Sequence, residues 1–188
     1  MSQDLWYAVK VRTRSEWLVE SQLRNKGYAP FLPTYKSNRR WSDRIKTMEL
    51  PLFPGYLFCQ FDVLKRLPIL TTLGVSSIVG IGRVPEPIDD AEIEAIRTVI
   101  RSSAAYGPCP YVTVGQCVRV EYGSLYGLTG LVTNVRNETR LIISVDMLMR
   151  SISVEVDQAW VRPIGTTPRN RFQLPAPGRM PSASVALR

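Results

Sequence analysis

Carboxylates and thiols are the side chains in this sequence that could do chemistry, because no histidine occurs among its 188 residues. The chain therefore lacks the commonest general base and the usual partner of a serine or cysteine nucleophile. Its densest group of carboxylates lies where a helix is predicted to begin, and acidic side chains there cap backbone N–H groups and complement the helix dipole. This group comprises Asp89, Asp90, Glu92 and Glu94. The sequence predicts no catalytic residues and disfavours an enzyme.

The three cysteines indicate neither a disulfide framework nor a metal site. Cys59, Cys109 and Cys117 are odd in number, form no Cys-x-x-Cys pair and have no histidine with which to share a metal. The run Gly80-Ile81-Gly82 lacks the third glycine of a phosphate-binding loop and indicates a turn. We therefore expect no cofactor and no metal.

At 188 residues the chain is longer than one average domain, so we expect a soluble protein with one domain and a second, smaller one. No run approaches the roughly 18–20 apolar residues of a membrane span. Met1 to Asp4 is polar and acidic, which is not the charged and then apolar start of a leader segment. We expect a cytoplasmic monomer with no membrane partner, since two small tethered domains need no second copy to bury their cores.

The net charge of +8 is unevenly distributed. Residues 1–106 hold 15 Lys/Arg against 11 Asp/Glu, residues 107–164 hold 5 against 5, and residues 165–188 hold 4 against 0. Arg12 and Arg14 follow the first predicted strand. A second segment holds five cations and one acid within eleven residues: Lys36, Arg39, Arg40, Asp43, Arg44 and Lys46. Such clusters suit a phosphate backbone, and a solvated basic loop is the alternative for any single residue.

The segment Leu50 to Asp62, LPLFPGYLFCQFD, is the densest run of large apolar and aromatic side chains. Two prolines keep its start extended, a glycine allows a bend, and Tyr56 to Phe61 is typical of a strand. The strand period of two divides its side chains between a face with Leu57, Cys59 and Phe61 and a face with Tyr56, Phe58 and Gln60. We expect the first face to be core and the aromatic face to be open to a partner. A central strand covered by helices on both faces is the alternative.

Other patterns before residue 104 predict further strands and two helices. Leu5 to Val11, LWYAVKV, alternates as a strand does, and a helix follows that Ser15 can cap and Gly27 ends. Val19 and Leu23 face inward on this helix. The chain is then extended, and the basic segment forms a hairpin arm before the aromatic strand.

The stretch from Val63 to Leu73 is predicted to be short-helical or irregular, and Gly74 to Ile81 to be a strand. A second helix begins behind its acidic cap and keeps helical spacing at Ile93, Ile96, Val99 and Ile100. Residues 5–103 are therefore predicted as an α+β domain, with a mostly antiparallel sheet of four to five strands flanked by helices.

The composition changes beyond residue 103. Residues 104–111 have the small, glycine and proline content of a linker. Residues 112–164 show no helical period and predict five short strands, hence a small five-stranded β-barrel with Leu125 and Leu128 in its core. Residues 165–188 are proline-rich and unpatterned, and we expect them to be disordered.

Four segments in this order resemble the NusG family of transcription elongation factors, over nearly all of residues 6–164. They are WYAVKV at 6–11, PLFPGYLF at 51–58, LGVSSIVGIG at 73–82 with the PEPIDDAEIEAIR helix after it, and VGQCVRVEYGSLYGLTGLV at 114–132. The last resembles a KOW motif, in which a glycine turn joins two strands. Its tight path would be allowed by Gly123, Gly127 and Gly130. The resemblance implies a NusG-type N-terminal domain at 5–103 and a KOW domain at 112–164.

The resemblance also implies a partner, bacterial RNA polymerase. An aromatic patch of the family docks on the clamp helices of the largest catalytic subunit, and the matching positions are Phe53, Pro54, Tyr56 and Phe58. The RfaH branch touches the facing gate loop at the positions of Lys65, Arg66 and Leu67, although the family's small hydroxyl residues are absent there. Spanning both would favour the closed, forward-moving enzyme and suppress pausing. Upstream or non-template DNA would meet Arg12, Arg14, Arg39 and Arg40.

The family's KOW domain has Rho and the ribosomal protein that doubles as NusE among its partners. The NusE-facing loop corresponds to Met147, Leu148 and Arg150, and ordinary rim residues are the alternative. The ending at 147–164 is more similar to specialised paralogues of RfaH, LoaP and UpxY type than to housekeeping NusG. Autoinhibited RfaH holds its C-terminal domain as a helical hairpin with an acidic residue at the place of Leu50. We therefore expect strands here and no helical hairpin.

Two functions remain. The resemblance implies a transcription elongation and antitermination factor that binds polymerase through its N-terminal domain and a second partner through its KOW domain. The alternative is a KOW-containing ribosomal or RNA-binding structural protein, because such barrels also occur there and the chain is basic. The balanced charge of residues 107–164 argues against an RNA-bound barrel.

Overall fold

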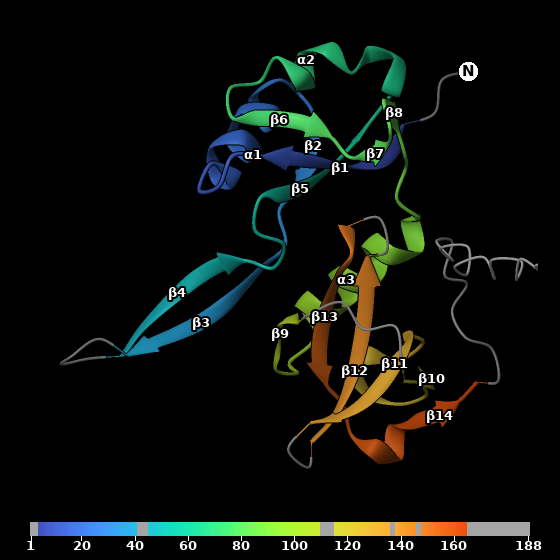
Figure 1. The fold of residues 1–188 in the computed structure, drawn as a ribbon. Helices are drawn as coiled ribbons and strands as arrows, with labels where there is room; N and C mark the ends of the chain where they lie inside the picture. The colour runs from blue at the N-terminus through green and yellow to red at the C-terminus, as the bar shows by residue number, and fades with distance from the viewer. Residues whose placement is uncertain (1–3, 41–44, 110–114, 136–137, 146–147, 165–188) are drawn as a thin grey trace, which may run out of the picture.

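Two antiparallel sheets organise the computed structural model, which describes residues 4–40, 45–109, 115–135, 138–145 and 148–164 (Figure 1). The N-terminal sheet has four strands in the order β2-β5-β1-β6. They are β1 (Leu5–Val11), β2 (Ala29–Phe31), β5 (Tyr56–Phe61) and β6 (Val75–Ile78). β1 pairs antiparallel with β5 and β6, and β2 pairs antiparallel with β5, so the predicted antiparallel sheet is confirmed.

The N-terminal sheet is apolar on both faces. One face carries Tyr7, Val9, Leu57, Cys59 and Phe61, and the other carries Trp6, Ala8 and Phe58. The strand period of two predicted this division in β5. Strands of this kind are found where other elements cover both faces of a sheet.

Helix α1 (Glu16–Asn25) covers the first face. Val19 and Leu23 lie four residues apart and are fully buried, as their spacing predicted. Gly27 follows the helix with a φ of 85°, a left-handed conformation that favours glycine. Ser15 occupies the N-cap position, but its side chain makes no capping hydrogen bond, so the predicted cap is wrong.

The connection after β5 adds to the same cover. It forms the 3₁₀ turn η1 (Val63–Lys65) and the short helix α2 (Leu67–Leu70), which places Ile69 in the core beside α1. The Lys26 ammonium at the end of α1 donates hydrogen bonds of 2.8 Å to the Pro68 carbonyl and to the Thr72 hydroxyl. These bonds fasten the two helices to each other.

A long hairpin leaves the body of the molecule, as the basic segment predicted. Its strands are β3 (Thr34–Arg40) and β4 (Ile45–Pro51), which pair in register over their whole length. Figure 1 shows the hairpin projecting away from both sheets. Its base is anchored, because the Leu52 N–H donates to the Pro33 carbonyl at 2.9 Å.

Helix α3 (Asp90–Arg101) follows the small ladder of β7 (Gly80–Ile81) with β8 (Val84–Pro85). The Asp89 carboxylate accepts a hydrogen bond of 2.9 Å from the Ala91 N–H, which confirms the predicted acidic cap. The buried face of the helix consists of Ile93, Ile96 and Val99.

The C-terminal sheet has six antiparallel strands in the order β14-β10-β11-β12-β13-β9. These are β9 (Tyr106–Cys109), β10 (Gln116–Val120), β11 (Thr129–Val135), β12 (Glu138–Val145), β13 (Arg150–Glu155) and β14 (Val161–Pro163). All five predicted strands are present, but the predicted count of five is too low, because β9 is a sixth strand of this sheet. The prediction that residues 104–111 are only a linker is wrong, because β9 pairs with β13 and becomes an edge strand of the sheet.

The predicted tail at 165–188 lies outside the described residues, as does Met147. In the part of the chain that the structure describes, no helix is long and apolar enough to span a membrane.

Replacing the N-cap residue by alanine should affect stability differently at α3 and at α1. Asp89→Ala removes the capping oxygen of α3, and we expect the free energy of unfolding to fall by about 1 kcal/mol. Ser15→Ala is the matched control at α1, where there is no capping bond to lose, and we expect a change within about 0.5 kcal/mol. Urea unfolding measures both. Equal losses would show that the capping bond contributes nothing.

Candidate functional site

The turn Phe53–Tyr56 joins the hairpin to β5 and is the predicted partner-binding segment. The Tyr56 N–H donates to the Phe53 carbonyl at 3.0 Å, and Gly55 has a φ of 84°. A proline followed by a glycine with this φ is the signature of a type II turn. Pro54 is exposed at its tip, and Tyr56 is half-buried.

Two of the four aromatic-patch residues are not exposed. Phe53 and Phe58 keep 1% and 0% of their surface accessible, and their rings meet edge to face with centroids 5.5 Å apart. The prediction that the aromatic face of β5 is open is therefore wrong for these residues. The alternative, a central strand covered by helices on both faces, is correct in that both faces are covered, but the second face is covered by the C-terminal sheet as well as by α3.

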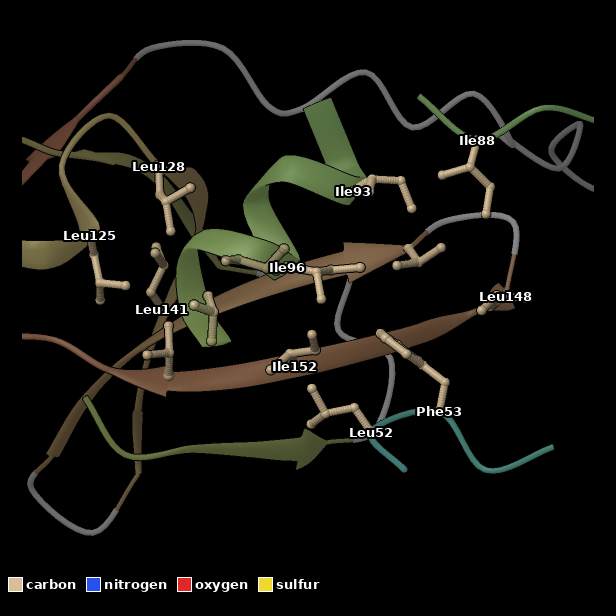
Figure 2. Close-up of a cluster of buried hydrophobic side chains, with 14 of the residues drawn as sticks. Leu52, Phe53, Ile88, Ile93, Ile96, Leu125, Leu128, Leu141, Leu148 and Ile152 are labelled. Atoms are coloured by element: carbon tan, nitrogen blue, oxygen red, sulfur yellow. The ribbon is translucent and has the colours of Figure 1, made fainter. Parts of the chain in front are cut away.

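One apolar cluster, called here the shared core, covers that face. It joins the N-terminal sheet and its turn to α3 and to the C-terminal sheet, with members that include Trp6, Phe53, Phe58, Ile93, Ile96, Leu148 and Ile152. Figure 2 shows Leu52 and Phe53 pointing into the same cluster as Leu148 and Ile152. The Tyr106 hydroxyl of β9 also donates to the Thr34 carbonyl of β3 at 3.2 Å. The C-terminal sheet therefore sits where a partner of the aromatic face would have to bind.

Arg97 of α3 adds a polar contact to this cover. Its guanidinium carbon lies 4.9 Å from the ring centroid of Trp6 and 5.1 Å from that of Phe31, within reach of a cation–π interaction. Its Nη1 also donates to the Glu94 carboxylate at 2.6 Å. This role could not be predicted from the sequence, because Trp6, Phe31 and Arg97 meet only after the sheet and α3 have packed.

The three predicted gate-loop residues lie together on η1 and α2. Lys65 is exposed, Leu67 is 70% exposed, and Arg66 is partly buried and donates to the Val63 carbonyl at 3.2 Å. Other large apolar side chains of this connection are also accessible, namely Leu64, Leu70 and Leu73. These four leucines make the connection an exposed apolar stretch on the α1 side of the N-terminal sheet.

The four predicted nucleic-acid residues belong to two separate elements. Arg12 and Arg14 are exposed in the connection between β1 and α1, where Arg14 has a φ of 69°. Arg39 and Arg40 pair with Lys46 and Ile45 near the far end of the hairpin. Figure 1 shows that end lying away from both sheets.

The predicted KOW glycines have two different physical roles. Gly123 and Gly127 have φ values of 80° and 84°, which favour glycine in this turn. Gly130 instead allows close packing, because a Cβ there would collide with the Ile142 carbonyl oxygen of β12. Leu125 and Leu128 are buried, as predicted.

The predicted NusE-facing loop is only partly accessible. Arg150 is exposed, but Leu148 is 7% exposed and belongs to the shared core. Leu148 is therefore not accessible to a partner in this structure. Its neighbour Met149 is the accessible apolar side chain, at 59%, with a φ of 49°.

The thiols are in surroundings that suppress the reactive thiolate. Burial raises the pKa of Cys59 to about 12, and burial likewise raises the pKa of Cys109 and of Cys117. At neutral pH these groups are protonated and poor nucleophiles. Within the described residues, no group of three or more His, Cys, Asp or Glu side chains could hold a metal ion.

Comparison with known proteins finds one similar fold and several related sequences. A solved structure of Thermotoga maritima NusG, which concerns its domain interaction, matches 86% of this chain and 97% of its own, with a TM-score of 0.53 and 20% identity. That likeness concerns the fold. Two relatives, the NusG proteins of Helicobacter pylori and Thermus thermophilus, are 26% and 27% identical to this chain, and both are described as transcription termination/antitermination proteins. They align with 80% and 81% of this chain and with 93% and 94% of their own.

The family described as "Transcription termination factor nusG" matches residues 4–97, from the start of β1 into α3. This match spans the N-terminal sheet, the hairpin and the turn. The chain belongs to the NusG family.

The packing of the shared core can be tested at two neighbouring positions. Leu148→Glu would place a carboxylate among apolar side chains, and we expect the free energy of unfolding to fall by at least about 2 kcal/mol. An apolar fluorescent dye should bind more to this variant, because the aromatic face opens. Met149→Glu is the matched control at an exposed neighbour and should change neither reading. Equal dye binding by the two variants would contradict the contact.

Proposed function

We propose that this protein is a transcription elongation and antitermination factor that binds the clamp of bacterial RNA polymerase through the turn Phe53–Tyr56. Membership of the NusG family supports the proposal. The observation that carries it is the turn itself, in which Pro54 is exposed and Tyr56 is half-buried, next to the buried Phe53 in the chain. Aromatic anchors beside a rigid turn are typical of interface hot spots.

Full engagement of the clamp requires the shared core to open. Phe53 and Phe58 are packed under α3 and the C-terminal sheet, so a partner gains their area only when that sheet moves away. Burial of each aromatic side chain contributes about 1.5–3 kcal/mol. The closed form therefore competes with polymerase for the same surface. Polymerase binding would shift the population toward the open form.

The second polymerase contact is proposed at Lys65, Arg66 and Leu67. These residues lie on η1 and α2, which are on the opposite side of the N-terminal sheet from the shared core. A factor that holds clamp and gate loop at once would favour the closed, forward-moving enzyme over the paused one. It would suppress pausing without any chemical step.

The proposed nucleic-acid contacts are Arg12 and Arg14 in one place and Arg39 and Arg40 in another. The hairpin projects from the body and can reach DNA that the sheet itself does not touch (Figure 1). Contacts to phosphates position a protein on nucleic acid and read little sequence.

The C-terminal sheet is proposed to act as a KOW domain that recruits a second partner, NusE or Rho. Arg150 and Met149 are exposed next to the buried Leu148. Release from the shared core would expose Leu148 as well, so one opening step would uncover both binding surfaces. Polymerase binding and partner recruitment would then be coupled.

Binding to core polymerase tests the proposal. Tyr56→Ala should weaken the affinity of the full chain about tenfold, which corresponds to about 1.4 kcal/mol. Tyr122→Ala is the control, because Tyr122 is a 62% exposed tyrosine of the C-terminal part, and it should bind like wild type. Leu148→Glu should bind more tightly than wild type, since it opens the shared core. Equal affinity of wild type and Tyr56→Ala would contradict the proposed clamp site.

The nucleic-acid role predicts a change in salt dependence. In a variant with Arg12→Ala and Arg14→Asn, the slope of log affinity for a DNA duplex against log salt should fall by about 1 for each phosphate contact that is lost. Asparagine tolerates the left-handed φ of position 14. Arg24→Ala is the control, because that guanidinium is already paired with Glu20 at 2.6 Å. An unchanged slope in the double variant would exclude these two contacts.

A further inference from the structure

Glu16 is a buried carboxylate at the first turn of α1, and only 2% of its surface is exposed. Its Oε1 accepts a hydrogen bond of 2.9 Å from the backbone N–H of Gly55. Its Oε2 is buried and, within the described residues, has no hydrogen-bond partner. A carboxylate in this position is far from the surface that acidic residues normally occupy.

The partner of Glu16 is the central glycine of the turn Phe53–Tyr56. Inside a type II turn, the N–H of the third residue takes no part in the closing bond between the first and fourth residues. Here that closing bond runs from the Tyr56 N–H to the Phe53 carbonyl, and the Gly55 N–H is satisfied by Glu16 instead. The Gly55 carbonyl accepts a bond of 2.9 Å from the Val11 N–H at the end of β1. The N–H of Gly55 is thus bound by α1, and its carbonyl is bound by the end of β1.

The unpartnered oxygen indicates that fold stability alone does not account for this residue. A buried polar atom without a partner costs free energy, and this cost offsets part of what the bond from the Gly55 N–H contributes to the fold. Departures from the rule that buried polar atoms are hydrogen-bonded occur preferentially at functional sites. What Glu16 does provide is an acceptor that fixes the orientation of the Gly55 peptide, and through it the positions of Pro54 and Tyr56.

We propose that Glu16 is a positioning residue for the partner-binding turn: its carboxylate holds Gly55 so that Pro54 and Tyr56 are presented in one orientation. This role rests on the proposed function, because the turn is the proposed clamp contact. Pre-organisation of a binding loop raises affinity by removing the ordering cost from the binding step. Glu16 itself is buried and would make no direct contact with polymerase.

The test compares Glu16→Gln with Glu16→Met in the full chain. The two side chains are similar in length, but only glutamine keeps an oxygen that can accept from Gly55. Glu20→Gln, one turn along the same helix, is the control for a change of charge on α1. Circular dichroism checks that each variant is folded, and Glu16→Ala replaces Glu16→Met if that variant is not.

Amide hydrogen exchange is the direct reading. In Glu16→Met the Gly55 amide should exchange at least about tenfold faster than in wild type, while the amides of Leu57 to Phe61 keep their rates. Glu16→Gln and Glu20→Gln should keep slow exchange at Gly55. A purely structural role would instead accelerate the turn and the strand together, and that result would overturn the proposal. Unchanged Gly55 exchange in Glu16→Met would also overturn it.

Affinity for core polymerase is the second reading. Glu16→Met should bind about tenfold more weakly, and Glu16→Gln should bind like wild type. If wild type binds polymerase and Glu16→Met binds equally well, the positioning role is wrong. If wild type does not bind polymerase at all, the proposed function fails and the binding role of Glu16 fails with it. The exchange measurement then still shows whether Glu16 holds the turn, so the two failures are distinguishable.

Discussion

The structure depends on a sheet that is apolar on both sides and must be covered twice. α1 and α2 cover the face of Tyr7, Val9 and Leu57, and that cover is local in sequence. The opposite face carries Trp6 and Phe58. It is closed by α3 together with the C-terminal sheet. Because apolar area removed from water stabilises the fold at roughly 25 cal/mol per Å², this second cover joins the two parts of the chain.

The shared core also explains how one surface can serve two states. In the closed form, Phe53 and Leu148 contribute to the same cluster (Figure 2). In the proposed open form, Phe53 would contact polymerase, and Leu148 would belong to the surface that binds a second partner. The two contacts exclude each other, so the relative stability of the closed form would set how readily the factor binds. Under the proposed function, polymerase binding and partner recruitment would be coupled by this opening, with no change of secondary structure required.

Rigidity at the turn complements opening of the core. The Phe53–Tyr56 turn is fixed by its own closing bond, by the Val11 N–H and by Glu16, and these contacts come from the N-terminal part alone. They do not depend on the C-terminal sheet. The turn can therefore keep its shape when its cover leaves, as a preformed binding surface requires. Under the proposed function, the polar contacts would orient the turn, and the apolar contacts of the shared core would decide whether a partner can reach it.

Local chemistry determined much of this protein. Alternation in β1 and β5, the Asp89 cap, the glycine after α1 and the β-branched C-terminal segments specify their elements through neighbours a few residues away, and the structure has these elements where the sequence predicted them. The family follows from the same segments. Tertiary packing alone decided that Phe58 and Leu148 are buried and that β9 joins the second sheet. It also decided that Arg97 lies over the ring of Trp6 and that Glu16 accepts a hydrogen bond from Gly55. An alternating pattern shows that a strand face is apolar, but what covers that face depends on residues far away in the chain.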